Sequence, residues 1–168
     1  MRRWLAFAPI AVLLALGVLF AGYALKRDPQ VQPKALVGKP VPAVTLPDLE
    51  TGRPTPIATQ GPLLINFFAS WCAPCEVEHP QLMALEAQGV RVVGVAYKDA
   101  PDNSRAFLSR LGDPFAEKLA DRDGRAGIEF GVTGVPETFL VDAQGVIRAK
   151  HTGPLTAEDA EALLKSLP

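Results

Sequence analysis

Two cysteines, Cys72 and Cys75, are the residues whose type and spacing point most directly to chemistry. They follow an apolar run and stand at the start of a helical stretch, and two residues, Ala73 and Pro74, separate them. This spacing in this context is typical of a redox-active dithiol. Thiolates rather than thiols attack disulfides, and the free amides and dipole of a helix N-terminus stabilise a thiolate. We therefore expect Cys72, at the very start of the helix, to be the nucleophile.

The second cysteine is placed to complete the exchange reaction. Cys75 lies three residues after Cys72 and therefore on the same helix face. From there it can attack a mixed disulfide between Cys72 and a partner and release the partner, which makes it the resolving thiol. Pro74 restrains the loop between the two and falls in the first helical turn, where a missing amide costs least.

Three other uses of the pair fit its surroundings less well. A structural disulfide that closes so short a loop removes little chain entropy, worth about 2 kcal/mol. Covalent haem attachment requires His directly after the second cysteine, where this chain has Glu76. A metal site stays open as an alternative, because Cys72, Cys75 and His79 are ligands that suit Cu(I), although a closed zinc site wants four donors.

The elements that must position these residues follow a simple order. Leu63–Phe68 is a short apolar run typical of a buried strand, and strands, helices and a hairpin follow it. The order predicts an α/β fold with a mixed central sheet flanked by helices. We expect helices at 74–88, at 102–111 with Asp102 at its start, at 124–130, and from Thr156 onward with Asp159 in a capping box. We expect strands at 91–97, 138–141 and 146–150, the last two joined by a hairpin turn at 142–145. Short edge strands are expected at 43–46 and near Ile57.

An uncharged stretch of 22 residues from Trp4 to Leu25 precedes this domain, flanked by Arg2 and Arg3 and by Lys26 and Arg27. A helix of that length is roughly 33 Å long and can cross a membrane. A cleaved secretory signal is the alternative, but its apolar region is usually shorter. We expect a retained anchor whose flanking charges keep the N-terminus inside and the body outside the cytoplasm. Residues 1–27 are thus predicted as a membrane anchor, 28–40 as a Pro-rich tether and 41–168 as the folded domain.

The charge of the chain excludes one class of partner. Lys and Arg number 17 and Asp and Glu 18, and four of the positive charges lie in the first 27 residues. The body is therefore mildly acidic, with no basic block. Nucleic acid binding would require Lys and Arg clustered on one face, so we expect no nucleic acid partner.

Two segments resemble the thioredoxin fold. Residues 67–75 follow that family's pattern of a hydrophobic strand that runs into Trp-Cys-x-x-Cys, and residues 133–142 are similar to its loop in which a cis-proline faces the active-site disulfide. The resemblance implies a cis peptide bond between Val135 and Pro136. The spacing alone does not, since most X-Pro bonds are trans.

The residues around Pro136 narrow the resemblance. Gly-Val-Pro-Glu-Thr, with Glu137 after the proline, resembles the membrane-tethered thiol:disulfide interchange proteins of bacterial cytochrome c maturation, the DsbE or CcmG family. Further segments that resemble this family lie at 92–99, 121–124 and 78–79. Together the matching segments extend over most of residues 36–167. The resemblance implies a single-pass protein of the inner membrane with its domain in the periplasm. It implies a membrane thiol reductase as electron donor, and apocytochrome c or an assembly thiol protein as the partner that is reduced before haem attachment. A general or oxidising exchange protein is the alternative within the same fold.

One position departs from general thioredoxins. Their buried acid before the active site is here Asn66, which cannot take a proton. We therefore expect Glu78 and Glu137 to flank the dithiol and to raise its pKa or relay protons. The alternative for Glu78 is a solvated acid on the helix face. Trp71 is expected to act as a lid beside the sulfurs, with a partly buried place in the core as the alternative, and His79 and Tyr97 are expected to be packing or surface groups. The expected site comprises Cys72 and Cys75, supported by Trp71, Pro74, Glu78, Val135, Pro136 and Glu137, with a redox-active disulfide and no cofactor or resident metal.

Overall fold

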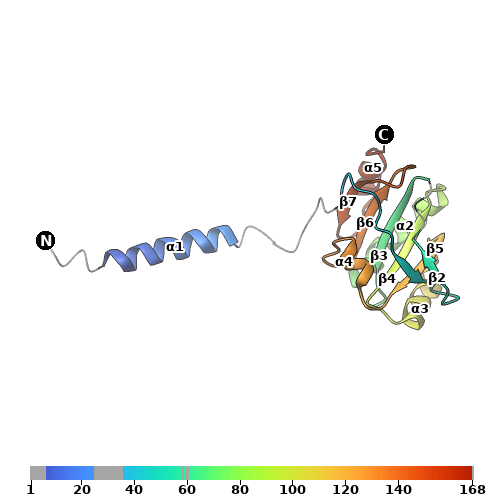
Figure 1. Ribbon diagram of the computed structural model, residues 1–168, viewed down its shortest axis with the longest axis horizontal. Helices are drawn as coiled ribbons and strands as arrows, with labels where there is room; N and C mark the ends of the chain where they lie inside the picture. Colours follow the sequence, from blue (N-terminus) through green and yellow to red (C-terminus); the bar gives the residue numbers. More distant parts are fainter. Residues whose placement is uncertain (1–6, 25–35, 58, 60, 168) are drawn as a thin grey trace. The chain divides into compact units, whose positions relative to one another are not determined.

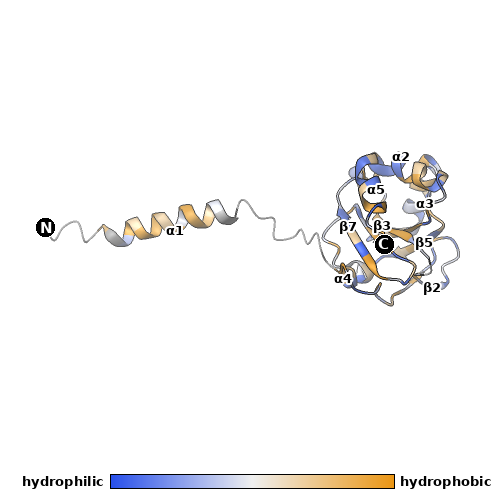
Figure 2. Ribbon diagram, turned by 90° about the horizontal axis from the view of Figure 1, so that it is seen from above, coloured by the Kyte–Doolittle hydropathy of each residue, from blue (hydrophilic) through white to orange (hydrophobic). Residues whose placement is uncertain are grey.

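The N-terminal segment forms a single helix in the computed structural model, which describes residues 7–24, 36–57, 59 and 61–167. Helix α1 (Ala8–Ala24) has 17 residues, and Figure 2 shows it predominantly hydrophobic. Within the described ranges, no helix is both long and apolar enough to cross a membrane. Both ends of the predicted span from Trp4 to Leu25 lie outside the described residues. Residues 28–35 of the predicted tether also lie outside them.

The chain divides into two compact units, Met1–Val31 and Gln32–Pro168. A five-stranded mixed sheet of order β5-β4-β3-β6-β7 organises the second unit (Figure 1). Strands β3, β4 and β5 are parallel to one another, whereas β6 and β7 are each antiparallel to their neighbours. The strands are β3 (Leu63–Phe68), β4 (Val92–Tyr97), β5 (Glu117–Asp121), β6 (Glu137–Val141) and β7 (Ile147–Thr152), and a separate antiparallel hairpin consists of β1 (Thr45–Pro47) and β2 (Pro54–Pro56).

Helices connect the parallel strands, because parallel neighbours require a long crossover. Helix α2 (Ala73–Ala87) joins β3 to β4, and α3 (Pro101–Leu111) joins β4 to β5. Helices α4 (Arg125–Glu129) and α5 (Ala157–Leu164) follow β5 and β7. The predicted α/β fold with a mixed sheet and flanking helices is confirmed.

The sheet has two apolar faces, since successive side chains of a strand point to opposite sides. One face packs against α2, α3 and α5 and includes Phe68 of the central strand; we call it the α2 face. The other packs against α4 and the β1–β2 segment and includes Ile65 and Phe67; we call it the α4 face. Every residue of β3 is buried, and all of them except Asn66 are apolar.

Most predicted element boundaries agree with the structure within a residue or two, but two predictions need correction. Strand β5 was not expected, and its first two residues, Glu117 and Lys118, are charged and only partly buried. Helix α3 begins at Pro101 with Ala100 as N-cap, and not at Asp102. Proline suits the first helical position, and an acid in the first turn complements the helix dipole.

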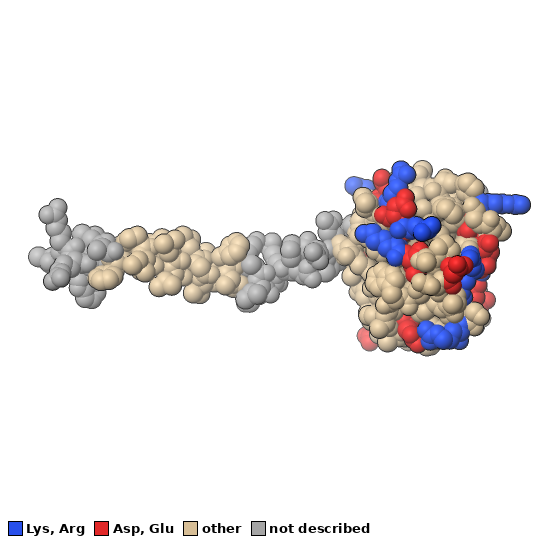
Figure 3. All heavy atoms as spheres, turned by 90° about the horizontal axis from the view of Figure 1, so that it is seen from below, with Lys and Arg blue, Asp and Glu red and all other residues tan. Residues whose placement is uncertain are grey.

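The C-terminal helix begins as the sequence predicts. Thr156 is its N-cap, and the reciprocal hydrogen bonds between Thr156 and Asp159 form a complete capping box. On the face of the second unit that Figure 3 shows, positive and negative side chains are interspersed. Neither sign gathers there into a large patch.

Candidate active site

The two cysteines form a disulfide at the N-terminus of α2. Their Cα atoms lie 5.3 Å apart, and both residues are almost fully buried. Cys72 is the N-cap residue, and its Sγ accepts a hydrogen bond of 3.1 Å from the backbone N–H of Cys75. Pro74 lies in the first turn, as expected. The sulfur of Cys72 therefore occupies the position at which a helix N-terminus stabilises negative charge.

The loop before β6 borders this sulfur. The peptide bond between Val135 and Pro136 is cis, as the resemblance implied. The carbonyl oxygen of Val135 lies 3.5 Å from Cys72 Sγ, and the preceding residues Thr133 and Gly134 are exposed. The loop that carries these exposed residues therefore lies against the sulfur that a partner must reach.

Trp71 lies at the surface beside the disulfide and not in the core. The residue is 60% exposed, and its Nε1 donates a hydrogen bond of 3.3 Å to the carbonyl oxygen of Lys98. Lys98 has a φ of 48°, in the left-handed region that a residue with a side chain seldom adopts. This turn after β4 therefore holds the indole ring of the residue that precedes Cys72.

Asp99 anchors the chain just before the active-site cysteines, a role that sequence reasoning missed. Its buried carboxylate accepts hydrogen bonds from Ser70 N at 2.8 Å and Ser70 Oγ at 3.0 Å, and from Ser104 Oγ at 2.7 Å. An acid two residues after a buried strand was the available signal. The carboxylate fixes Ser70 and thereby the entry to the Trp71–Cys75 segment.

Glu78 is buried in α2, one turn beyond Cys75. Its side chain accepts hydrogen bonds from Asn66 Nδ2 at 2.9 Å and from the backbone N–H of Leu155 at 2.8 Å. Burial raises the pKa of the Glu78 carboxyl to about 7, although these two hydrogen bonds act in the opposite direction. Residues three apart share a helix face, so this carboxyl lies on the side of α2 that carries Cys75.

Glu137 does not join Glu78, which corrects the expectation that both acids flank the dithiol. It pairs in register with Phe67 and therefore faces the α4 side of the sheet. There its carboxylate lies 2.8 Å from Lys150 Nζ, and both side chains are 0% exposed. It also accepts hydrogen bonds from the backbone N–H and the hydroxyl of Thr133. The charge of Glu137 is thus paired on the face opposite α2.

His79 packs between α2 and α3 and is not presented to the sulfurs. Its Nε2 lies within hydrogen-bond distance, 3.0 Å, of Gly112 O, and its ring meets Phe107 edge-on. Burial lowers the pKa of His79. The part of the chain that the structure describes holds no group of three or more His, Cys, Asp or Glu residues that could bind a metal. The alternative of a copper site on Cys72, Cys75 and His79 therefore gains no support.

Comparison with known proteins gives a consistent result. The Redoxin family model matches residues 36–164. The thiol:disulfide interchange protein HelX of Rhodobacter capsulatus is 43% identical over 163 residues, which cover 94% of this chain and 92% of HelX. The thiol:disulfide interchange protein DsbE of Escherichia coli K12 is 40% identical over 175 residues, which cover 99% of this chain and 95% of that protein.

A solved structure shares the fold. The crystal structure assigned to a thiol:disulfide interchange protein DsbE of Chlorobium tepidum matches with a TM-score of 0.65 and 30% sequence identity. The match covers 77% of this chain and 94% of that one.

Proposed function

The chain belongs to the Redoxin family and is a thiol:disulfide oxidoreductase, and we propose that it acts as a reductant in c-type cytochrome biogenesis outside the cytoplasm. The observation that carries the proposal is the identity of 40% or more, over almost the whole chain, with thiol:disulfide interchange proteins named DsbE and HelX. The proposed substrate is the disulfide of apocytochrome c, or of an assembly thiol protein, before haem is attached.

The first step of the proposed reaction takes place at Cys72. In the reduced protein its thiolate attacks one sulfur of the partner disulfide, so that the partner's S–S bond breaks and a mixed disulfide forms. The other partner sulfur leaves as a thiolate and takes up a proton. The N–H of Cys75, which donates to Cys72 Sγ at 3.1 Å, stabilises the negative charge on the nucleophile before attack.

The second step requires Cys75 to lose a proton in the core. Its thiolate attacks Cys72 Sγ, the mixed disulfide breaks, and the partner is released as a dithiol that has gained two electrons. Glu78, on the same side of α2 and with a pKa of about 7, is the group that we assign to accept this proton. The product is the Cys72–Cys75 disulfide present in this structure. A membrane-bound dithiol reductase returns the protein to its reduced form.

The proposed location is the periplasmic side of a bacterial inner membrane. The 22 uncharged residues from Trp4 to Leu25, with Arg2 and Arg3 before them, support a single N-terminal anchor that keeps the domain outside the cytoplasm. An anchored reductant needs an electron source in the same membrane, because its compartment is oxidising.

A mixed-disulfide trap tests the proposed partner. Cys75→Ser, expressed in the native envelope, leaves Cys72 bonded to whatever it attacks, and the adducts are identified by mass spectrometry. The double variant Cys72→Ser/Cys75→Ser is the matched control. Adducts dominated by apocytochrome c or by thiol proteins of its assembly support the proposal. Adducts with many unrelated secreted proteins would instead identify a general exchange protein.

A further inference from the structure

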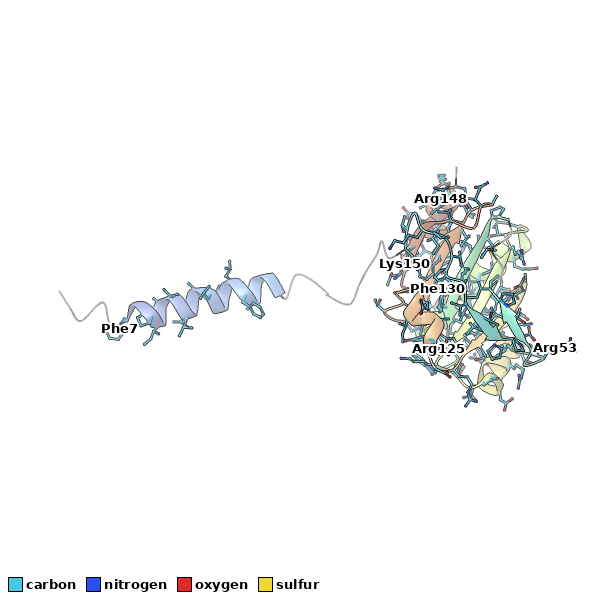
Figure 4. The ribbon with its side chains drawn as sticks, in the orientation of Figure 1. Phe7, Arg53, Arg125, Phe130, Arg148 and Lys150 are labelled. Atoms are coloured by element: carbon cyan, nitrogen blue, oxygen red, sulfur yellow. A yellow bond between two sulfur atoms is a disulfide. The ribbon has the colours of Figure 1, made fainter. Side chains whose placement is uncertain are left out.

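A buried lysine contacts both ends of the loop that borders Cys72. The side chain of Lys150, on β7, is 0% exposed, and its Nζ lies 2.8 Å from Glu137 Oε2. Nζ also donates a hydrogen bond of 3.0 Å to the carbonyl oxygen of Gly131. Lys150 pairs in register with Phe139, whose ring contacts that of Phe130, the C-cap residue of α4, so Lys150 and Phe130, both labelled in Figure 4, belong to the α4 face. One ammonium group therefore joins residue 131 to residue 137.

The same ion pair also reaches the middle of the loop. Glu137 Oε1 accepts hydrogen bonds from Thr133 N at 3.2 Å and from Thr133 Oγ1 at 2.7 Å. Residues 131, 133 and 137 are thus tied to one buried charge pair. Between the tied positions lie Gly134 and Val135, the part of the loop that approaches Cys72 Sγ.

Stability alone does not explain a pair buried in this way. Desolvation of two charges offsets most of their attraction, and a well-packed apolar pair of similar volume is often as stable. A charge pair differs from an apolar pair in the directional contacts that it makes, here to Gly131 O and, through Glu137, to Thr133. These contacts fix the position of the loop backbone.

We propose that Lys150 is a positioning residue that sets the distance between the Gly134–Val135 backbone and Cys72 Sγ and thereby speeds the reaction with polypeptide disulfides. Cys72 is almost fully buried, and the exposed Thr133 and Gly134 border its approach. A polypeptide bonded to Cys72 must lie against this loop, whereas a small disulfide needs to reach the sulfur alone. The proposal concerns thiol–disulfide exchange itself and does not depend on a cytochrome partner.

The test compares two substrates across four variants. The variants are Lys150→Met, Lys150→Arg, the double variant Lys150→Met/Glu137→Gln, which leaves no carboxylate buried without its cation, and Lys165→Met as the control at an exposed ion pair. Each protein is reduced, and its rate constants with a synthetic disulfide-bonded peptide and with 5,5′-dithiobis(2-nitrobenzoic acid) are measured by stopped flow. Circular dichroism and urea unfolding establish that each variant is folded.

We expect the double variant to react with the peptide slower by on the order of tenfold or more, because small misplacements of a docking surface have effects of this size. The rate of the double variant with the small disulfide should stay at the wild-type value. The variant Lys150→Arg keeps the positive charge, so its rate with the peptide should stay close to that of the wild type. Wild-type rates with both substrates would overturn the proposal. So would an equal loss with both, or failure of both methionine variants to fold, since Lys150 would then serve the sulfur site or the fold as a whole. If the substrate discrimination is found but the trap yields no cytochrome adduct, only the proposed partner fails.

Discussion

The side-chain amide of Asn66 donates a hydrogen bond of 2.9 Å to Glu78 Oε1 in the core between β3 and α2. The same amide donates to Thr138 Oγ1 at 3.0 Å, which links the central strand to β6. An amide cannot exchange a proton with its neighbour, so at this place in the core Glu78 is the group that titrates. In the proposed mechanism the proton-accepting group therefore lies on the helix that carries the cysteines, and not on the strand where the thioredoxin resemblance placed an acid.

The stability of the oxidised protein should fall as the pH rises from about 4.5 to about 7. The Glu78 carboxyl has an unperturbed pKa of 4.5 and a folded-state pKa of about 7, so the folded protein binds more protons than the unfolded chain in this window. The full effect is on the order of 3 kcal/mol. Urea unfolding at a series of pH values measures it. The slope should disappear in Glu78→Gln and persist in the control Glu76→Gln, whose carboxylate is exposed and paired with Arg110.

The Glu78→Gln variant should also slow the release of partners. Loss of a general base typically costs about 10²-fold or more, and here it acts only on the step in which Cys75 attacks the mixed disulfide. Quenched-flow measurement with a disulfide peptide separates formation of the adduct from its decay. We expect an unchanged rate of formation and a slow decay that loses the inflection near pH 7 and instead rises steadily with pH, because Cys75 must then lose its proton to the solvent. A decay as fast as in the wild type would remove Glu78 from the mechanism.

Replacement of Asp99 should loosen the segment before the cysteines. Asp99→Ala removes the acceptor of the hydrogen bonds from Ser70 and Ser104 and leaves the Ser70 N–H without its partner. Hydrogen bonds to a charged group contribute about 1.5–3 kcal/mol each, so a loss of about 3 kcal/mol or more in the free energy of unfolding is expected. Ser104→Ala, which removes one donor and leaves Ser70 anchored, should cost less. Equal losses in the two variants would contradict the anchoring role of Asp99.

Gly94 of β4 should not tolerate a side chain. A Cβ at this position would lie 2.6 to 2.9 Å from three ring atoms of Phe115, closer than packed carbon atoms approach. Gly94→Ala should therefore destabilise the fold by about 1–3 kcal/mol, as overpacked cores do. Thermal or urea unfolding measures the loss, and Phe115→Leu in the same chain should recover part of it. Gly134→Ala is a useful control, since nothing lies within 4 Å of a Cβ at that position.

The sequence was sufficient for elements whose stabilising interactions are local. The helix that starts at the cysteines and the Thr156 capping box each depend on neighbours within a few residues. Strand β3 pairs with the distant β4 and β6, but its apolar run is itself a local signal of a buried strand. Strand β5 is different. Its charged beginning carries no strand pattern, and it is a strand because Val93–Tyr97 pairs with it on one side and Leu49 N donates to Lys118 O on the other. Such contacts between distant segments leave no local signal.

In the active site, too, residues that belong to local motifs could be predicted, whereas residues placed by contacts between distant segments could not. Cys72, Cys75 and Pro136 were predicted from motifs, and the structure brings them together. The side of the sheet that Glu137 faces depends on the register of β6 against β3, and one residue of shift would reverse it. Lys150 stands in a strand that is otherwise partly exposed, so nothing in the sequence signals that its side chain is buried.

In helix α2 the reactive sulfur of Cys72 is also the atom that accepts the N-cap hydrogen bond. Most helices use a hydroxyl or carboxylate oxygen for this purpose, whereas here the amide of Cys75 meets the sulfur of Cys72. That sulfur is a disulfide atom in one state, a thiolate in the next and part of a mixed disulfide between them. Each change in the redox state of Cys72 therefore changes the acceptor of the first hydrogen bond of the helix. The free energy of unfolding and the reduction potential of the protein are consequently coupled through a single amide. A substitution that alters one of these quantities will also alter the other.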